Sequence, residues 1–407
     1  MINIMFELNG KYNTCKVFSD NADDTAIGQL IELLNQESIS NSQVRIMSDY
    51  HSGKGCVIGT TMTIKDKVIP SLVGVDIGCG VLCAKLSQKV DLQHLDDVIY
   101  NHVPNGFNIF DEVTIENEYL SDIIADIDIT RANKSLGTLG GGNHFIEVDE
   151  DLDGNQYLVI HTGSRHLGIE VCRYWQNIAY EKLKLKENDG KTLRELTKEL
   201  VEKYTAEGRK KEISRVLQKL RDDYKSTKVE IPYDLAYLEG ANLQGYLHDM
   251  KIAQYHAWLN RETILNNIVK AMKLEVVDKF QTIHNYIDLN NMILRKGSIS
   301  AQKDEKVIIP MNMRDGSLIC IGKGNIDWNY SAPHGAGRLM SRNQAKESIS
   351  MQVFRDSMTD IFSTSVCSST VDEAPQAYKP MDEIIQNIKD TVEIIDIIKP
   401  IYNFKAH

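Results

Sequence analysis

The chain lacks the features that mark membrane, secreted and fibrous proteins. Its 407 residues contain no uninterrupted apolar stretch near the roughly 18 residues that a membrane-spanning helix needs. Residues 1–8 include Glu7 and are not followed by a small-residue cleavage site, so we expect no secretory signal peptide. The seven cysteines are scattered and odd in number. This pattern argues against a disulfide framework and favours a reducing, cytoplasmic environment.

An excess of basic charge and the common nucleotide motifs are also missing. The net charge of −11 excludes a surface coated with basic side chains, although a local arginine-lined groove can still bind phosphates. The glycine-rich segments match neither the dinucleotide fingerprint nor a P-loop, which ends in Gly-Lys-Ser/Thr. The Lys-x-Asp-Gly string of the lysine-nucleophile ligases is absent too. What remains is a composition of 42% hydrophobic and 25% charged residues, typical of a globular protein with a substantial core.

The first part of the chain, residues 1–165, has a β-rich pattern. Apolar runs at 43–47, 73–77 and 157–161 are separated by Gly, Asn and Asp turns and predict strands.

The middle of the chain, at about 170–275, is predicted to be helical. The Lys-, Glu-, Arg- and Leu-rich segment 182–228 indicates a solvated helical hairpin, and 234–273 has apolar residues at helical spacing. We assign His248 and His256 in this second helix to structural roles.

Beyond residue 274 the pattern returns to short strands and glycine turns, and a final helix is predicted over 381–399. We therefore predict an α/β (α+β) fold: one large domain over residues 1–407, with central β-sheets and a charged helical insertion at about 170–275.

Several metal-ligand residue types lie in glycine- or asparagine-rich segments at the ends of β-like runs. Gly74-Val-Asp-Ile-Gly-Cys-Gly80 places Asp76 three residues before Cys79, whose thiolate could bridge two cations. A tight turn with a buried cysteine would explain this segment equally well. The other members are three histidines, His144, His161 and His284. Together these residues predict a centre with one or two metals, because catalytic groups collect at strand ends.

One further histidine, His334, is flanked by Gly335 and Gly337. Glycine lets the backbone approach a phosphate closely, although such a string alone is more often a simple loop. The metal-ligand segments elsewhere favour a functional role for it as a nucleophile. Arginines favour bidentate phosphate contacts, and the candidates are Arg165, Arg295 with Lys296, Arg338 and Arg342.

The ordered motifs resemble those of the RtcB family of RNA-splicing and RNA-repair ligases. They are Gly-Val-Asp-Ile-Gly-Cys-Gly, Gly-Gly-Gly-Asn-His-Phe-Ile-Glu, His-Thr-Gly-Ser-Arg, His-Asn-Tyr, Arg-Lys-Gly and His-Gly-Ala-Gly-Arg-Leu-Met-Ser-Arg, between about Ser48 and Lys405. The resemblance implies an enzyme that joins RNA 3′-phosphate or 2′,3′-cyclic phosphate ends to 5′-hydroxyl ends, in RNA repair or tRNA splicing. It also implies GTP and two manganese ions as cofactors.

The resemblance further implies a role for each matching residue. His334 would carry GMP, and Cys79 would bridge two metals, one completed by Asp76 and His144, the other by His161 and His284. Asp49 would belong to the catalytic site. The residues expected to contact the nucleotide are Asn143, Glu147, Arg165, Arg338, Tyr378 and Lys405.

One segment departs from the family pattern. Ile309-Pro-Met-Asn-Met-Arg-Asp-Gly316 stands where the family usually has Pro-Gly-Ser-Met-Gly, and Asn312, Arg314 and Ser317 are candidates to take over its nucleotide contacts. Cysteine and histidine ligands would also favour zinc or cobalt over manganese on softness alone. Two alternatives stay open: a metal-dependent phosphodiesterase acting on RNA ends, which would not need His334, and a non-catalytic RNA-end-binding protein.

Overall fold

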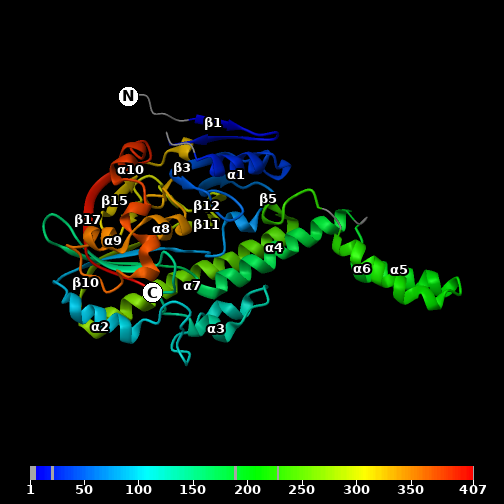
Figure 1. Ribbon diagram of the computed structural model, residues 1–407, viewed down its shortest axis with the longest axis horizontal. Coiled ribbons are helices and arrows are strands. Elements are labelled where there is room, and N and C mark those ends of the chain that lie inside the picture. Colours follow the sequence, from blue (N-terminus) through cyan, green and yellow to red (C-terminus); the bar gives the residue numbers. More distant parts are fainter. Residues whose placement is uncertain (1–5, 20–22, 188–189, 227–228, 407) are drawn as a thin grey trace.

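Two large β-sheets form the body of the protein (Figure 1). The computed structural model describes residues 6–19, 23–187, 190–226 and 229–406. The six-stranded sheet has the order β1-β2-β3-β4-β12-β11. Its strands are β1 (Phe6–Asn9), β2 (Thr14–Val17), β3 (Val44–His51), β4 (Ile58–Thr63), β12 (Ile293–Lys296) and β11 (Asn285–Asp288).

The seven-stranded sheet has the order β10-β6-β8-β7-β17-β15-β14. Its strands are β10 (Val276–Ile283), β6 (Gly80–Leu86), β8 (Gln156–Thr162), β7 (Phe145–Glu150), β17 (Val392–Lys405), β15 (Gly316–Gly322) and β14 (Lys306–Asn312). Its two edge strands meet, because the Ile308 amide of β14 donates to the Thr282 hydroxyl of β10 at 3.1 Å. The sheet therefore curls around an apolar interior that includes Val81, Phe145 and Ile308.

Short elements connect the two sheets. Two small two-stranded sheets pair β5 (Lys67–Val68) with β9 (Leu238–Glu239) and β13 (Ser298–Ser300) with β16 (Ser331–Pro333). The shorter helices are α1 (Asp24–Leu34), α2 (Leu92–His102), α3 (Ile129–Lys134), α8 (Arg342–Ser348), α9 (Met351–Ser357) and α10 (Met381–Asn387).

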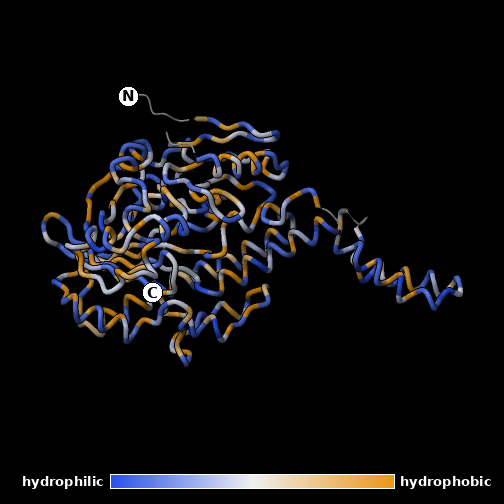
Figure 2. The backbone as a smooth tube through the Cα atoms, in the orientation of Figure 1, coloured by the Kyte–Doolittle hydropathy of each residue, from blue (hydrophilic) through white to orange (hydrophobic). Residues whose placement is uncertain are grey.

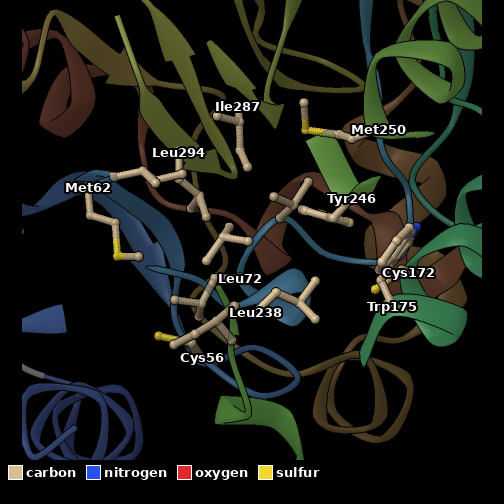
Figure 3. Close-up of a cluster of buried hydrophobic side chains, with 14 of the residues drawn as sticks. Cys56, Met62, Leu72, Cys172, Trp175, Leu238, Tyr246, Met250, Ile287 and Leu294 are labelled. Carbon is tan, nitrogen blue, oxygen red and sulfur yellow. The ribbon is translucent and has the colours of Figure 1, made fainter. Parts of the chain in front are cut away.

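Two long helices, α4 (Arg165–Glu187) and α7 (Gly240–Met272), join the sheets through their apolar faces. Trp175 of α4 and Tyr246 and Met250 of α7 lie in one buried cluster with side chains of the six-stranded sheet, such as Leu294 (Figure 3). The second half of α7 packs Ile264 and its neighbours against the outer face of the seven-stranded sheet. Burial of these apolar faces, each side chain contributing about 1.5–3 kcal/mol, fixes both helices on the body.

A helical arm made of α5 (Leu193–Ala206) and α6 (Ile213–Ser226) projects from the body (Figure 1). Thr192 and Glu195 form a reciprocal capping box that begins α5. Polar and apolar residues alternate along both arm helices (Figure 2). The predicted helical hairpin within 182–228 is confirmed, apart from residues 188–189 and 227–228, which lie outside the described residues.

The predicted α/β (α+β) class and the strands at 43–47 and 157–161 are confirmed. Two predicted elements are wrong. Residues 73–77 form no strand, because Gly74 and Gly78 take left-handed conformations (φ +93° and +72°) and the next strand begins only at Gly80. The predicted helix over 381–399 ends at Asn387, and Val392 begins strand β17, whose β-branched residues pair with β15 and β7. No helix among the described residues combines the length and apolar character needed to span a membrane.

Candidate metal and nucleotide site

The predicted metal ligands converge because they belong to neighbouring strands of the seven-stranded sheet. Cys79 lies just before β6, His144 just before β7, His161 near the end of β8, and His284 just after β10. The pairing register sets Gly80 opposite Thr162 and Phe145 opposite His161. All four ligand side chains therefore lie together at one end of these four neighbouring strands.

The ligand atoms form a continuous row. Asp76 Oδ2 lies 3.0 Å from His144 Nε2, which lies 3.5 Å from Cys79 Sγ. The thiol lies 3.3 Å from His161 Nε2, and that nitrogen lies 3.5 Å from His284 Nε2. The row divides into two triads that share Cys79, Asp76–Cys79–His144 and Cys79–His161–His284, each with its ligand atoms within 4.8 Å of one another. The structure thus groups the five residues in the same two sets as the sequence prediction.

In two of the histidines, a hydrogen bond at Nδ1 orients the ring so that Nε2 faces this row. His144 Nδ1 lies 2.8 Å from the Leu139 carbonyl and His161 Nδ1 lies 3.1 Å from the Asn143 carbonyl, so each Nδ1 must carry the proton. Nε2 of each ring is then the nitrogen that can offer a lone pair to the row. The Nε2 lone pairs and the Asp76 carboxylate lie 3.0–3.5 Å from their neighbours in the row, where they repel one another unless a cation lies between them.

Burial controls the charge of these ligands. It lowers the pKa of His161 and of His284 well below the ordinary imidazole value, which keeps both rings neutral and able to donate a lone pair. Burial, with the adjacent Asp76 carboxylate, raises the pKa of the Cys79 thiol well above its ordinary value. A divalent cation offsets that cost, because a coordinating thiol is deprotonated. The donor set therefore fits one or two divalent metals.

Two residues of α7, Asn260 and Arg261, fix the backbone of the ligand segments by hydrogen bonds. The Asn260 side chain accepts from the amides of Gly137 and Thr138 and donates to the Gly163 carbonyl. The fully buried Arg261 donates to the carbonyls of Gly78 and Thr162 at 2.8 Å each. The sequence analysis predicted only that this segment is helical. Nothing in an Asn-Arg pair within an amphipathic helix indicates that it holds a metal site.

His334 is held by Asp49. The Asp49 Oδ2 atom lies 2.6 Å from His334 Nδ1 and accepts from the amides of His334 and Gly335. The buried carboxylate keeps the proton on Nδ1 and leaves the lone pair on Nε2. The His334 ring lies beside that of the metal-ligand candidate His284, with centroids 4.9 Å apart. The ring of His334 is thus oriented by Asp49 at the end of the metal-ligand row.

Gly337 makes this contact possible. It takes a left-handed conformation, with φ at +73°, and a side chain there would overlap the Asp49 carbonyl. The sequence analysis linked the glycines around His334 to a phosphate. The structure gives Gly337 a different requirement, the close approach of the Asp49 backbone.

A cavity of about 680 Å³ opens in front of His334. Its volume suits a small-molecule ligand. The predicted nucleotide-contacting residues Asn143, Glu147, Arg338, Tyr378 and Lys405 line it, together with His161, His284 and Met311–Met313. Arg165 is not among the lining residues; its guanidinium donates to the Thr138 hydroxyl and the Gly106 carbonyl.

A family model described as tRNA-splicing ligase RtcB matches residues 29–128 and 121–406 of this chain. The chain belongs to the RtcB family. The RNA-splicing ligase RtcB of Escherichia coli K12 is 28% identical over 407 aligned positions that cover 89% of this chain and 90% of that protein. RtcB2 of E. coli ATCC 25922 is 25% identical (96% and 95% coverage), and the tRNA-splicing ligase RtcB of Aeropyrum pernix is 26% identical (84% and 83%).

The cavity of this RtcB-family chain also contains an acidic residue, Glu373, that the sequence motifs do not predict. Glu373 contacts Lys405 Nζ at 3.0 Å, the Tyr378 hydroxyl at 2.8 Å and the guanidinium groups of Arg338 and Arg342 at 3.4 and 2.6 Å. Burial opposes its ionisation, but these cations outweigh it and lower the pKa of Glu373 to about 2. Its only sequence signal is the acidic pair Asp372–Glu373, which is too common to identify a site.

The second cavity carboxylate, Glu147, has the opposite shift. Burial raises its pKa to about 7, although Lys405 and a hydrogen bond from the Asn403 side chain oppose that rise. The buried Asp149 carboxyl two residues along has a pKa raised well above its ordinary value by burial and by Glu147. The pair therefore carries at most one negative charge at neutral pH.

The structure places the predicted phosphate-contacting arginines in different environments. Arg338 lines the cavity, as does Arg342, whose side chain is 43% exposed. The prediction for Arg295 and Lys296 is wrong. The fully buried guanidinium of Arg295 donates to Ser331, Tyr286 and the Tyr330 carbonyl, and Lys296 donates to backbone carbonyls in the interior. Neither can reach a phosphate.

The altered segment of this RtcB-family chain is a β-hairpin, in which β14 ends at Asn312 and β15 begins at Gly316. Asn312 lines the cavity, as predicted for a replacement contact. The Arg314 side chain instead pairs with Asp315 at 2.7 Å, and Ser317, in β15, is fully buried. The prediction that Ser317 takes over a nucleotide contact is therefore wrong.

Proposed function

We propose that this RtcB-family chain is an RNA ligase that joins RNA 3′-phosphate or 2′,3′-cyclic phosphate ends to 5′-hydroxyl ends, with GTP as the activating nucleotide. One observation carries the proposal. A histidine oriented by a buried carboxylate, with its Nε2 lone pair free, lies at the end of a row of metal ligands and faces a cavity of nucleotide size. A phosphodiesterase or a passive RNA-end binder would have no use for that histidine.

The residues support a three-step reaction. His334 Nε2 attacks the α-phosphorus of GTP, so that an N–P bond forms and pyrophosphate leaves, while Asp49 stabilises the proton on Nδ1. An oxygen of the RNA 3′-phosphate next attacks the histidine-bound phosphorus, and the N–P bond breaks. The 5′-hydroxyl then attacks the activated RNA phosphorus, GMP leaves, and the hydroxyl proton passes to solvent. A cyclic phosphate end must first be opened by water.

Other cavity residues would bind and orient the nucleotide. Glu147 in its ionised form can accept from the N–H groups of guanine, and Lys405 can donate to the guanine oxygen. Arg338 and Arg342 carry the positive charge that phosphates need, although Glu373 partly neutralises it. Asn312 takes the place of the nucleotide-binding serine of the usual family motif.

Two divalent cations fit the triads that share Cys79. When bound, they would neutralise the triphosphate and the charge that develops on the transferred phosphorus. The family resemblance favours manganese, whereas one thiolate and three imidazoles would bind zinc or cobalt at least as tightly. Activity with each metal added to metal-free protein will rank them.

The test is incubation of the purified chain with radiolabelled GTP and manganese, followed by acid. We expect a protein-bound GMP that is acid-labile, because it is a phosphoramidate, and that is absent from His334→Ala. The matched control is His248→Ala, since His248 is an exposed histidine outside the cavity lining whose Nε2 lies 3.0 Å from the Asp122 carbonyl oxygen. An acid-stable adduct, or an adduct retained in His334→Ala, would refute the mechanism. RNA-end cleavage without ligation, unchanged in His334→Ala, would instead identify the phosphodiesterase.

A further inference from the structure

Phe107 is the most unusual apolar residue on the surface, with 98% of it exposed. Among the described residues only Leu152 is a large apolar side chain of equal exposure. Leaving an aromatic ring in water costs hydrophobic free energy that burial in the core would recover. A rigidly displayed, fully exposed aromatic ring is therefore a candidate contact surface.

The turn that carries Phe107 is fixed to the metal-ligand segments. The Gly106 amide donates to the Gly140 carbonyl at 2.8 Å, and the Leu139 amide donates to the Pro104 carbonyl at 2.9 Å. Arg165 Nη2 donates to the Gly106 carbonyl at 3.1 Å. Gly140 has φ at +85°, and any side chain there would overlap the Arg165 guanidinium. These bonds hold the Phe107 backbone in one place relative to the site.

The position of this turn separates it from the nucleotide cavity. Gly140–Gly142 lead directly into Asn143 and His144, and the amide of Ser164, the residue before Arg165, donates to Asp76 Oδ1 at 3.2 Å. The turn therefore belongs to the Asp76–His144 end of the ligand row, whereas His334 and the cavity lie at the His284 end. Asn143 lines the cavity, and Phe107 stands outside it. In Figure 1 the segment between α2 and α3 lies at the lower edge of the body.

We infer that Phe107 is a stacking platform for an unpaired base of the RNA strand that enters the site at its Asp76–His144 end. The inference rests on the proposed function. Aromatic side chains stack on any base, so the contact tolerates different sequences. Arg342 lies between this segment and the cavity that it lines, with Nη2 4.0 Å from the position that a side-chain carbon at Gly142 would take, and its partly exposed guanidinium can meet the backbone phosphate of the same strand.

The first test compares ligation kinetics on single-stranded RNA with a 3′-phosphate. We expect Phe107→Ala to raise the KM for RNA by about five- to a hundredfold, the loss that follows removal of one stacked base. Phe107→Trp should restore a KM near that of the wild type. The matched control is Leu152→Ala, which removes an equally exposed side chain from the β7–β8 turn at the far end of those strands and should leave the KM unchanged. His334 guanylylation, which uses no RNA, gives the reference rate for each variant.

A second measurement does not depend on turnover. Titration of Phe107→Trp with a single-stranded 3′-phosphate RNA should quench tryptophan fluorescence beyond any quenching in the wild type, because the indole stacks on a base. Equal KM values for wild type and Phe107→Ala, or equal quenching, would overturn the inference. A change of oligomeric state in Phe107→Ala with an unchanged KM would also overturn it and would assign Phe107 to a protein contact. If the wild type did not ligate RNA but RNA still quenched the fluorescence of Phe107→Trp, the proposed function would be refuted while the assignment of Phe107 as a stacking platform would stand.

Discussion

At the scale of single residues, the cavity sets two buried carboxylates in opposite electrostatic environments. Glu373 is surrounded by Lys405, Arg338 and Arg342 and is ionised. Burial raises the pKa of Glu147 to about 7, and the Lys405 charge that opposes this rise also pairs with Glu373. The two glutamates therefore compete for Lys405. Glu373 is accordingly a positioning residue that holds the cations and Tyr378 in place.

This arrangement predicts a pH-dependent stability contribution from Glu373. Its folded pKa of about 2 lies below the ordinary value of 4.5, so ionised Glu373 stabilises the fold above pH 4.5 and loses that contribution as the pH falls towards 2. We expect Glu373→Gln to lower the free energy of unfolding at pH 7 by on the order of 3 kcal/mol. The gap from the wild type should close between pH 5 and pH 2. Denaturant unfolding across this range measures it.

The control for this prediction is Glu202→Gln, which removes an exposed carboxylate from α5. It should leave the pH profile of unfolding unchanged, because exposed pairs contribute little. A gap between wild type and Glu373→Gln that stayed constant down to pH 2 would contradict the assigned charge state. It would mean that the glutamine disturbs packing rather than the ion cluster.

At the scale of elements, helix α7 does more than cover the sheet. Its side chains at 260 and 261 satisfy backbone groups of three separate ligand segments at once. Loops rarely hold metal ligands accurately without such support, because outer partners fix the orientation of the ligands. The metal geometry therefore depends on the docking of a helix that supplies no predicted ligand.

We expect Asn260→Ala to weaken metal affinity by about 10- to 100-fold while the fold stays intact. The alanine leaves the Gly137 amide without its side-chain acceptor and removes one of the two acceptors of the Thr138 amide, and so loosens the segment before His144. Calorimetric titration with manganese and with zinc measures affinity, and circular dichroism checks the helices. Asn266→Ala is the matched control, because Asn266 is an exposed asparagine on the same helix. Unchanged metal affinity in Asn260→Ala would show that the ligand segments keep their conformation without this side chain.

At the scale of the whole molecule, residues in short ordered motifs can be located from the sequence, whereas residues that act across long distances cannot. The metal ligands and His334 stand in recognisable strings. Glu373 works through contacts with Lys405 and Arg338 that only the fold creates. Arg295 lies in the string Arg-Lys-Gly, yet its complete burial depends on packing that no local pattern specifies. Residues 392–399 have a charged residue at every third position among apolar ones, a spacing that does not separate helix from strand until β15 and β7 provide partners.

We expect the projecting arm to contribute little to the stability of the body. Each described residue from 191 to 225 remains at least partly exposed, and α5 and α6 pack mainly on each other. We expect replacement of residues 191–226 by a short flexible linker to shift the Tm by no more than about 4 °C, corresponding to roughly 1 kcal/mol. Guanylylation of His334 should persist. Trp175→Ala in α4, which removes a buried side chain bonded to Asp249, should by contrast cost about 3–5 kcal/mol. Scanning calorimetry decides the matter: a Tm loss in the arm deletion as large as that of Trp175→Ala would show that the arm belongs to the cooperative unit formed by the two sheets.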